Sequence, residues 1–97
     1  MASTKEYRNF IIEQLNILDN ITYKPMMGEY LLYYDELLFG GIYDDRFLVK
    51  IVPNNKKYHM EEAIPYDGAK PMYLVSDVDD INKLKNIVID TYNGLKK

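Results

Sequence analysis

The sequence is short of the residue types on which much protein chemistry depends. It has no cysteine and no tryptophan, a single histidine at His59, and serine only at Ser3 and Ser76. The absence of cysteine excludes disulfides, thiolate zinc sites and cysteine nucleophiles together. A small domain without disulfides is typical of a reducing compartment, so we expect a cytoplasmic protein.

Nucleophilic catalysis needs a base within reach of the nucleophile and a third group that orients that base. Both serines lie beside expected helix starts, where capping accounts for their hydroxyls. His59 lies in a polar stretch and is expected on the surface. We therefore expect no hydrolase triad, no catalytic residue and no enzyme.

Long apolar runs and an excess of positive charge are also missing. No run approaches the ~18 residues of a membrane span, and residues 1–8 are polar where a secretory signal would be apolar. We expect neither export nor membrane association. The net charge of −3 argues against binding to nucleic-acid backbone, which needs clustered positive charge.

What remains is an ordinary globular composition, with 47% hydrophobic and 28% charged residues. At roughly 100–200 residues per domain, the 97 residues predict one domain, residues 1–97. A domain of this size buries little more than ~60% of the surface that its unfolded chain exposes. We therefore expect no large internal ligand cavity unless two chains share one.

The first half predicts one helix and an antiparallel meander. Ser3 and Glu6 have the spacing of a capping box, so we expect a helix to begin there and to end near Asp19-Asn20. Tyrosine and branched apolar residues then dominate, as in consecutive strands. We expect strands at Ile21–Lys24, Glu29–Tyr34, Leu37–Tyr43 and Phe47–Val52, with turns at Asp35-Glu36 and Asp44-Asp45-Arg46. Residues 25–28 leave two alternatives open, a bulge in one long bent strand or a turn between two strands.

The second half predicts a short helix, a loop, a strand and a long helix. The polar stretch 56–62 is the short helix, with Asn54 or Asn55 as its cap. Two prolines and Asp-Gly favour a loop at 65–71, and a strand follows at 72–75. The last helix follows the acidic run 77–80, keeps apolar residues at helical spacing and stops at Gly94.

This order, α-β-β-β-α-β-α, predicts the α+β class: a two-layer sandwich with an antiparallel sheet of four to five strands and helices packed on one face. The strand 29–34 has apolar side chains on both faces: Tyr30, Leu32 and Tyr34 on one, and Leu31 and Tyr33 on the other. A half-solvated strand would alternate apolar with polar residues. Either a partner covers the second face, because tyrosine suits protein interfaces, or the tyrosines fill a small core and its wet rim.

Carboxylates are the remaining candidates for acid–base work or cation binding. A helix start accounts for the run 77–80, because the helix dipole favours negative charge there, and its spacing misses the calcium-loop pattern. Glu29 differs, because it begins an apolar strand. We expect Glu29 to be partly buried and paired with Arg46 or Lys50, and we expect no metal site.

Two further patterns are weak. Gly40-Gly41 lies inside an expected strand without a following Gly-Lys-Ser/Thr, which excludes a phosphate-binding loop and favours a bulge or a close backbone approach. A basic and aromatic patch for single-stranded nucleic acid would combine Lys50, Lys56, Lys57 and Lys70 with Tyr58, Tyr66 and Tyr73. Acidic neighbours dilute this patch, so direct nucleic-acid binding is not expected.

Two long runs, MMGEYLLYY at 26–34 and LFGGIYDDRFLVK at 38–50, closely resemble the N-terminal domain of the bacterial TfoX/Sxy family. PYDGAKPM at 65–72 and the helix after 77–80 resemble the second half of that domain, in the same order. The resemblance implies an α+β domain without catalytic residues. It also implies a link to regulators of natural competence that act with a cyclic-AMP receptor protein at promoters.

The chain also departs from the family pattern at two points. Competence regulators of the family carry a second, C-terminal domain, whereas this sequence stops at Lys97, so it resembles the stand-alone members. Relatives tend to place Asp-Gly where this chain has Asp35-Glu36, so a different type of hairpin turn is expected there.

Residues and resemblance together predict a non-enzymatic protein-interaction module, a transcription accessory protein without cofactor or metal. We expect a protein partner, either part of the transcription machinery or a second copy of the chain. The alternative is a small-ligand or nucleic-acid-binding domain that uses the loop 65–71. The residues expected to make the interaction are Tyr30, Leu31, Tyr33, Arg46, Lys50, Tyr66 and Lys70.

Overall fold

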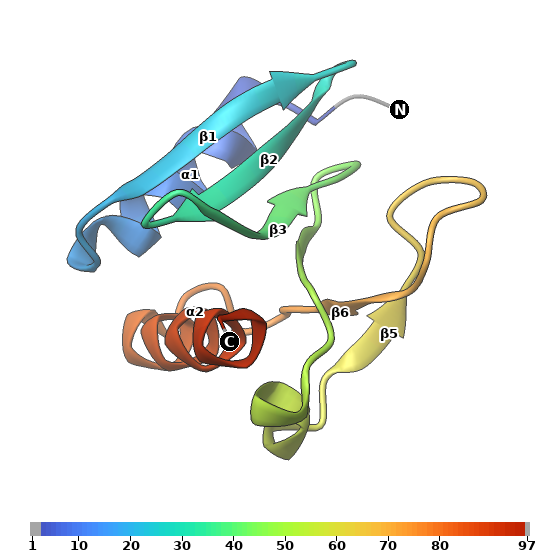
Figure 1. Ribbon diagram of the computed structural model, residues 1–97. Coiled ribbons are helices and arrows are strands. Elements are labelled where there is room, and N and C mark those ends of the chain that lie inside the picture. The colour runs from blue at the N-terminus through green and yellow to red at the C-terminus, as the bar shows by residue number, and fades with distance from the viewer. Residues whose placement is uncertain (1–2, 97) are drawn as a thin grey trace.

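The computed structural model describes residues 3–96 (Figure 1). The helices are α1 (Lys5–Gln14), the 3-10 turns η1 (Leu15–Ile17) and η2 (Pro53–Tyr58), and α2 (Ile81–Leu95). The strands are β1 (Ile21–Met26), β2 (Glu29–Tyr34), β3 (Leu37–Ile42), β4 (Phe47–Val49), β5 (Glu61–Ala63) and β6 (Met72–Leu74). No helix within residues 3–96 is long and apolar enough to cross a membrane.

The strands form one antiparallel sheet in the order β1-β2-β3-β4-β6-β5. Side chains from α1, α2 and one sheet face share a single hydrophobic cluster, which confirms the α+β class with helices on one face. The sheet has six strands instead of four to five. The expected helix at 56–62 is wrong: η2 begins earlier, at Pro53, and residues 61–63 pair with β6 as strand β5.

Three hairpins are closed by two-residue turns in which both residues have positive φ. They are Met27-Gly28, Asp35-Glu36 and Asp44-Asp45. This is the type I′ arrangement, whose twist matches that of the flanking strands. The bulge alternative at 25–28 is therefore wrong, and so is the change of turn type expected at Asp35-Glu36. Pro25 lies on β1, which is an edge strand of the sheet. Proline is tolerated on an edge strand because one side of that strand has no neighbouring strand to hydrogen-bond.

The start of α1 differs from the expected capping box. The N-cap is Thr4, whose hydroxyl accepts the Tyr7 N–H at 3.1 Å. Ser3 is 7% exposed, and its hydroxyl donates instead to Oε1 of Glu29 at 2.6 Å. The expected cap is wrong because this longer-range hydrogen bond occupies the serine.

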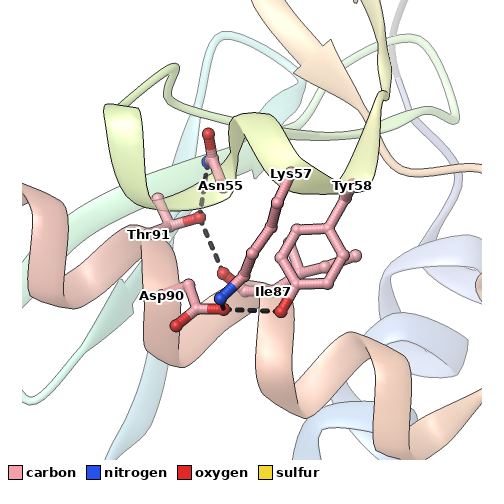
Figure 2. A network of polar contacts seen from close by, with 6 residues as sticks. All are labelled: Asn55, Lys57, Tyr58, Ile87, Asp90 and Thr91. Carbon is pink, nitrogen blue, oxygen red and sulfur yellow. Dashed lines mark hydrogen bonds and ion pairs between the residues drawn. The ribbon is translucent and has the colours of Figure 1, made fainter.

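A polar network fixes η2 against α2 (Figure 2). Asn55 is fully buried; its amide donates to Oγ1 of Thr91 at 2.8 Å, and Thr91 donates to the carbonyl of Ile87 at 2.7 Å. Beside it, the Tyr58 hydroxyl lies 2.5 Å from Oδ2 of Asp90, and Nζ of Lys57 lies 3.1 Å from the same oxygen. The expected N-cap at Asn54 or Asn55 is wrong, because the N-cap of η2 is Val52. Asn55 instead accepts the Val52 N–H at 3.2 Å as the third residue of η2 and joins η2 to α2.

The end of α2 also differs from expectation. The helix continues through Gly94 to Leu95, so Gly94 is not its stop. A β-carbon at Gly94 would lie 2.6 Å from Cγ2 of Val52. The glycine thus allows α2 and the chain before η2 to approach closely.

Candidate functional site

The sheet face that points away from the helices, here called the open face, is apolar and aromatic. Leu31 pairs with Lys24 and Gly41, and Tyr33 pairs with Thr22 and Leu38, so these side chains share that face. Tyr30, Leu32 and Tyr34 point to the other side, where they join or pack against the core. The predicted division of β2 into two apolar faces is confirmed.

A pocket of about 790 Å³ lies on the open face, under the loop that joins β5 to β6. Leu31, Leu38 and Lys50 line it from the sheet side. Tyr66 and Lys70 line it from the loop. The volume falls within the ~300–1,000 Å³ of small-molecule sites. The pocket is formed between sheet and loop and lies outside the hydrophobic core.

Arg46 holds this loop in place. Its Nη2 donates to the carbonyl oxygens of Ile64 and Pro65, at 3.1 and 3.3 Å, and its Nε donates to that of Tyr43 at 3.2 Å. Within the loop, Gly68 has a φ of 84°, and the Ala69 N–H donates to the Tyr66 carbonyl. Figure 1 shows the loop rising from the ends of β5 and β6, well apart from α2. Arg46 is thus a positioning residue for the pocket wall.

Tyr43 forms the inner wall of the pocket. Its side chain is 5% exposed, and its ring centroid lies 6.0 Å from that of Tyr66. Burial is the main cause that raises the pKa of Tyr43, with smaller contributions from Tyr66, Glu29 and Tyr33. The phenol therefore stays neutral at physiological pH.

Lys50 and Lys70 are the charged residues of the pocket lining. Within residues 3–96 the ion pairs are Lys57 with Asp90 and Lys83 with Asp77, so neither pocket lysine is paired. The chain as a whole carries a net charge of −3. The pocket is therefore a local cationic site on an acidic protein.

The structure brings together most of the predicted interaction residues. Leu31, Lys50, Tyr66 and Lys70 line one pocket. Tyr33 lies on the same face, with Nζ of Lys24 5.5 Å from its ring centroid. Arg46 acts through the loop. Tyr30 lies elsewhere: it is 8% exposed on the core side, beneath the guanidinium of Arg8, because strand alternation turns it away.

The predicted interaction residues and loop omit several residues of the pocket lining, among them Leu38 and Tyr43. The register of β2 with β3 shifts between Leu32 and Tyr33, so simple alternation does not give the faces of β3. A β-carbon at Gly40 would lie 2.2 Å from the Leu48 carbonyl oxygen. Of the two alternatives expected at Gly40-Gly41, the close backbone approach is therefore confirmed, while the bulge lies just before them, at Phe39. Gly40 also lines the pocket.

Glu29 has other partners than those expected. Its carboxylate accepts the N–H and hydroxyl of Ser3 and the N–H of Asp44, and it pairs with neither Arg46 nor Lys50. Lys50 lines the pocket instead. The Arg46 guanidinium donates its hydrogen bonds to backbone carbonyl oxygens. Glu29 therefore joins three chain segments.

The other candidate groups do not converge. Asp80 caps α2 by accepting the Lys83 N–H, and Asp77 pairs with the side chain of Lys83. No group of three or more metal-ligating side chains occurs among residues 3–96. The basic and aromatic patch is not assembled either, because Lys57 and Tyr58 are tied to Asp90 and Tyr73 lies in the core.

Comparison with known proteins agrees with this architecture. The sequence model of the TfoX N-terminal domain matches residues 13–92. A protein from Spirochaeta aurantia is 32% identical over 80 residues, which cover 80% of this chain and 70% of that protein. It is described as an uncharacterised 12.7 kDa protein in the trpE 5′ region.

Proposed function

Because this chain belongs to the family of the TfoX N-terminal domain, we propose that it is a non-enzymatic protein-interaction module that serves as a transcription accessory protein. The family is linked to competence and transformation, which supports a role in binding a protein of the transcription machinery. The observation that carries the proposal is the open face. Leu31 and Tyr33 lie there on β2, and no helix among residues 3–96 covers them.

The edges of the sheet favour binding through the face. An exposed edge strand can pair with another chain, and proteins block this with charge, proline or short strands. On β1 the edge carries Lys24 and Pro25, both exposed. At the other edge, β5 has three residues, of which Glu61 and Glu62 are exposed and acidic. Both edges thus have the features that discourage strand addition.

The arrangement of reactive groups supports a non-enzymatic role. Ser3 is bonded to Glu29, and His59 caps η2 on the surface. Neither lies in the pocket, and the pocket lining contains no carboxylate. A nucleophile with a base in hydrogen-bond reach, which covalent catalysis needs, is not formed in the pocket.

The test compares partner capture by the wild type and by a variant of the open face. Tagged protein is incubated with bacterial lysate, with and without nuclease, and bound proteins are identified by mass spectrometry. Tyr33→Lys places a charge on the open face, whereas Asn86→Lys places one on the exposed side of α2 as a matched control. Light scattering on the purified chain distinguishes a second copy from a different partner.

We expect a component of the transcription machinery that resists nuclease, is lost with Tyr33→Lys and is retained with Asn86→Lys. A concentration-dependent dimer abolished only by Tyr33→Lys would assign the face to a second copy. A monomer whose captured proteins do not depend on Tyr33 would refute binding through the open face.

A second candidate function is small-ligand binding, which the pocket favours specifically. A flat protein interface does not need a concave site of about 790 Å³ between the sheet and a loop. Arg46 donates two hydrogen bonds to carbonyl oxygens at the start of that loop, and a third to the Tyr43 carbonyl fixes its own side chain. Such a pre-formed concave wall is typical of small-molecule sites.

A further inference from the structure

We propose that the pocket under the loop 65–71 is a binding site for a small amphipathic carboxylate, with its apolar body on the sheet and its carboxylate at Lys50 and Lys70. This inference rests on the second candidate function, small-ligand binding, and does not depend on the protein-interaction role. The two share Leu31 but are separable at Tyr33, which is half-buried on the open face and does not line the pocket.

The apolar part of the ligand is defined by the pocket wall. Leu31 and Leu38 face it from neighbouring strands, and Met72 faces it from β6. Met is flexible and fills irregular gaps, which suits a site that accepts an alkyl or aryl body. Burying such a body removes apolar surface of both ligand and protein from water, which supplies the main driving force.

The charged part follows from the two lysines. Lys50 and Lys70 come from opposite sides, the sheet and the loop, and no acidic residue lines the same pocket. Because neither is paired within residues 3–96, a ligand anion competes with no resident carboxylate. A cationic ligand of the same size would be repelled by both.

Tyr43 supplies a second, independent polar group. The residue is 5% exposed and lines the pocket, and its hydroxyl, which forms no hydrogen bond with residues 3–96, is not among the buried polar atoms and therefore reaches the solvent-filled pocket. A neutral phenol is both donor and acceptor. Its position in the pocket wall therefore leaves it available to a polar ligand atom.

Carboxylate fits this site better than phosphate. Phosphate sites commonly use backbone N–H groups at a helix N-terminus or the fork of an arginine. Neither α1 nor α2 lines the pocket, and the Arg46 guanidinium is used on carbonyl oxygens. Two separate ammonium groups are sufficient for a single carboxylate.

The experiment uses octanoate as the probe on the full chain, followed by calorimetry and by amide chemical shifts. Hexanoate, octyl phosphate and octyltrimethylammonium test chain length, headgroup and charge. We expect octanoate to shift amides around Leu31, Tyr43 and 65–71. Hexanoate should bind roughly tenfold more weakly, since it lacks two CH₂ groups worth ~0.8 kcal/mol each, and octyl phosphate more weakly than octanoate.

Charge variants complete the test. The double variant Lys50→Gln, Lys70→Gln should weaken the binding of octanoate at least tenfold. Lys56→Gln changes an exposed lysine of η2 and should leave the affinity for octanoate unchanged. All are compared after their amide spectra show the native fold.

Several results would overturn the ligand site. These are no binding of octanoate, equal binding of octyltrimethylammonium, shifts centred outside the pocket, or a double variant that binds like the wild type. Tighter binding of octyl phosphate would overturn the choice of carboxylate. None of these results alters the Tyr33→Lys test, so the two proposals fail separately.

Discussion

The hydroxyl of Ser3 donates to Oε1 of Glu29 across 2.6 Å, between residues 26 positions apart in the chain. The same carboxylate accepts the Ser3 N–H at 2.9 Å and the Asp44 N–H at 3.1 Å. Ser3 in turn accepts the Asp45 N–H at 3.0 Å. One carboxylate thus joins the start of α1, the start of β2 and the turn between β3 and β4.

Replacing this carboxylate should destabilise the fold. Glu29→Gln keeps the shape but loses the charge of an acceptor that serves three donors. Hydrogen bonds to charged groups are worth about 1.5–3 kcal/mol, so we expect the free energy of unfolding to fall by about 1–2 kcal/mol in urea titration. Glu62→Gln, an exposed carboxylate on β5, is the matched control. Equal stability of both variants would show that the Ser3–Glu29 contact is energetically unimportant.

The turn at Asp35-Glu36 offers a stabilising substitution. Glu36 has a φ of 69°, and a left-handed conformation costs a residue with a β-carbon roughly 1–2 kcal/mol. Glycine avoids that cost but loses more entropy on folding. We expect Glu36→Gly to raise the free energy of unfolding by about 1 kcal/mol. Glu36→Ala, which keeps the β-carbon, should give no such gain; a gain of the same size with alanine would point to charge as the cause.

The positions of the long strands could be predicted because Ile21 to Val52 combines branched and aromatic residues with short polar turns. The alternation in β2 also predicted which side chains face away from the helices. Strand β5 could not be predicted, because Glu-Glu-Ala has no apolar pattern and becomes a strand only by pairing with β6. Its assignment depends on tertiary contacts that a local pattern does not contain.

The candidate site was predictable in the same uneven way. Lys50, Tyr66 and Lys70 were selected from composition and loop character, and they do line one pocket. The pocket itself depends on Arg46 reaching the carbonyls of residues 64 and 65. Every residue has a backbone carbonyl, so the residues that accept these hydrogen bonds can be of any type. The sequence therefore contains no pattern that would predict which carbonyls Arg46 reaches. The missed wall residue Tyr43 follows a bulged strand, where alternation fails.

Alkaline pH should weaken the contact between η2 and α2. Burial, followed by the hydrogen bond and the charge of Asp90, raises the pKa of Tyr58 from its usual 10 to about 12. A folded-state pKa above the unfolded one means stabilisation that is complete below pH 10 and lost as the pH rises through about 12. We expect wild type to exceed Tyr58→Phe in stability at pH 7, with a difference that shrinks between pH 10 and 12.

The measurement for Tyr58 is urea unfolding of both proteins across that pH range. Other tyrosines also ionise there, so the difference between wild type and variant isolates Tyr58. The same comparison with Tyr66→Phe, an exposed tyrosine of the loop, serves as the control. A difference that stays constant up to pH 12 would contradict the assigned role of the Tyr58–Asp90 contact.

The core face of α2 can be tested at Leu84, which is fully buried. Truncation of a buried leucine removes apolar contacts and leaves a cavity, at a cost of about 2–5 kcal/mol. We expect Leu84→Ala to lower the free energy of unfolding, measured by thermal or urea unfolding, by an amount in this range. Ile81→Ala, at a residue that is 40% exposed on the same helix, should cost much less. A loss below about 1 kcal/mol for Leu84→Ala would mean that another face of α2 is buried.

Gly94 tests whether close approach or helix propensity governs the end of α2. Alanine is favoured over glycine inside a helix by about 0.8–1 kcal/mol. A β-carbon at this position, however, would meet Cγ2 of the buried Val52 at 2.6 Å, and overpacking costs about 1–3 kcal/mol. We therefore expect Gly94→Ala to lower the free energy of unfolding by about 1 kcal/mol. Asn93→Ala, on the exposed side of the same turn, should raise it slightly. A stability gain in both variants would mean that α2 can shift away from Val52 at little cost.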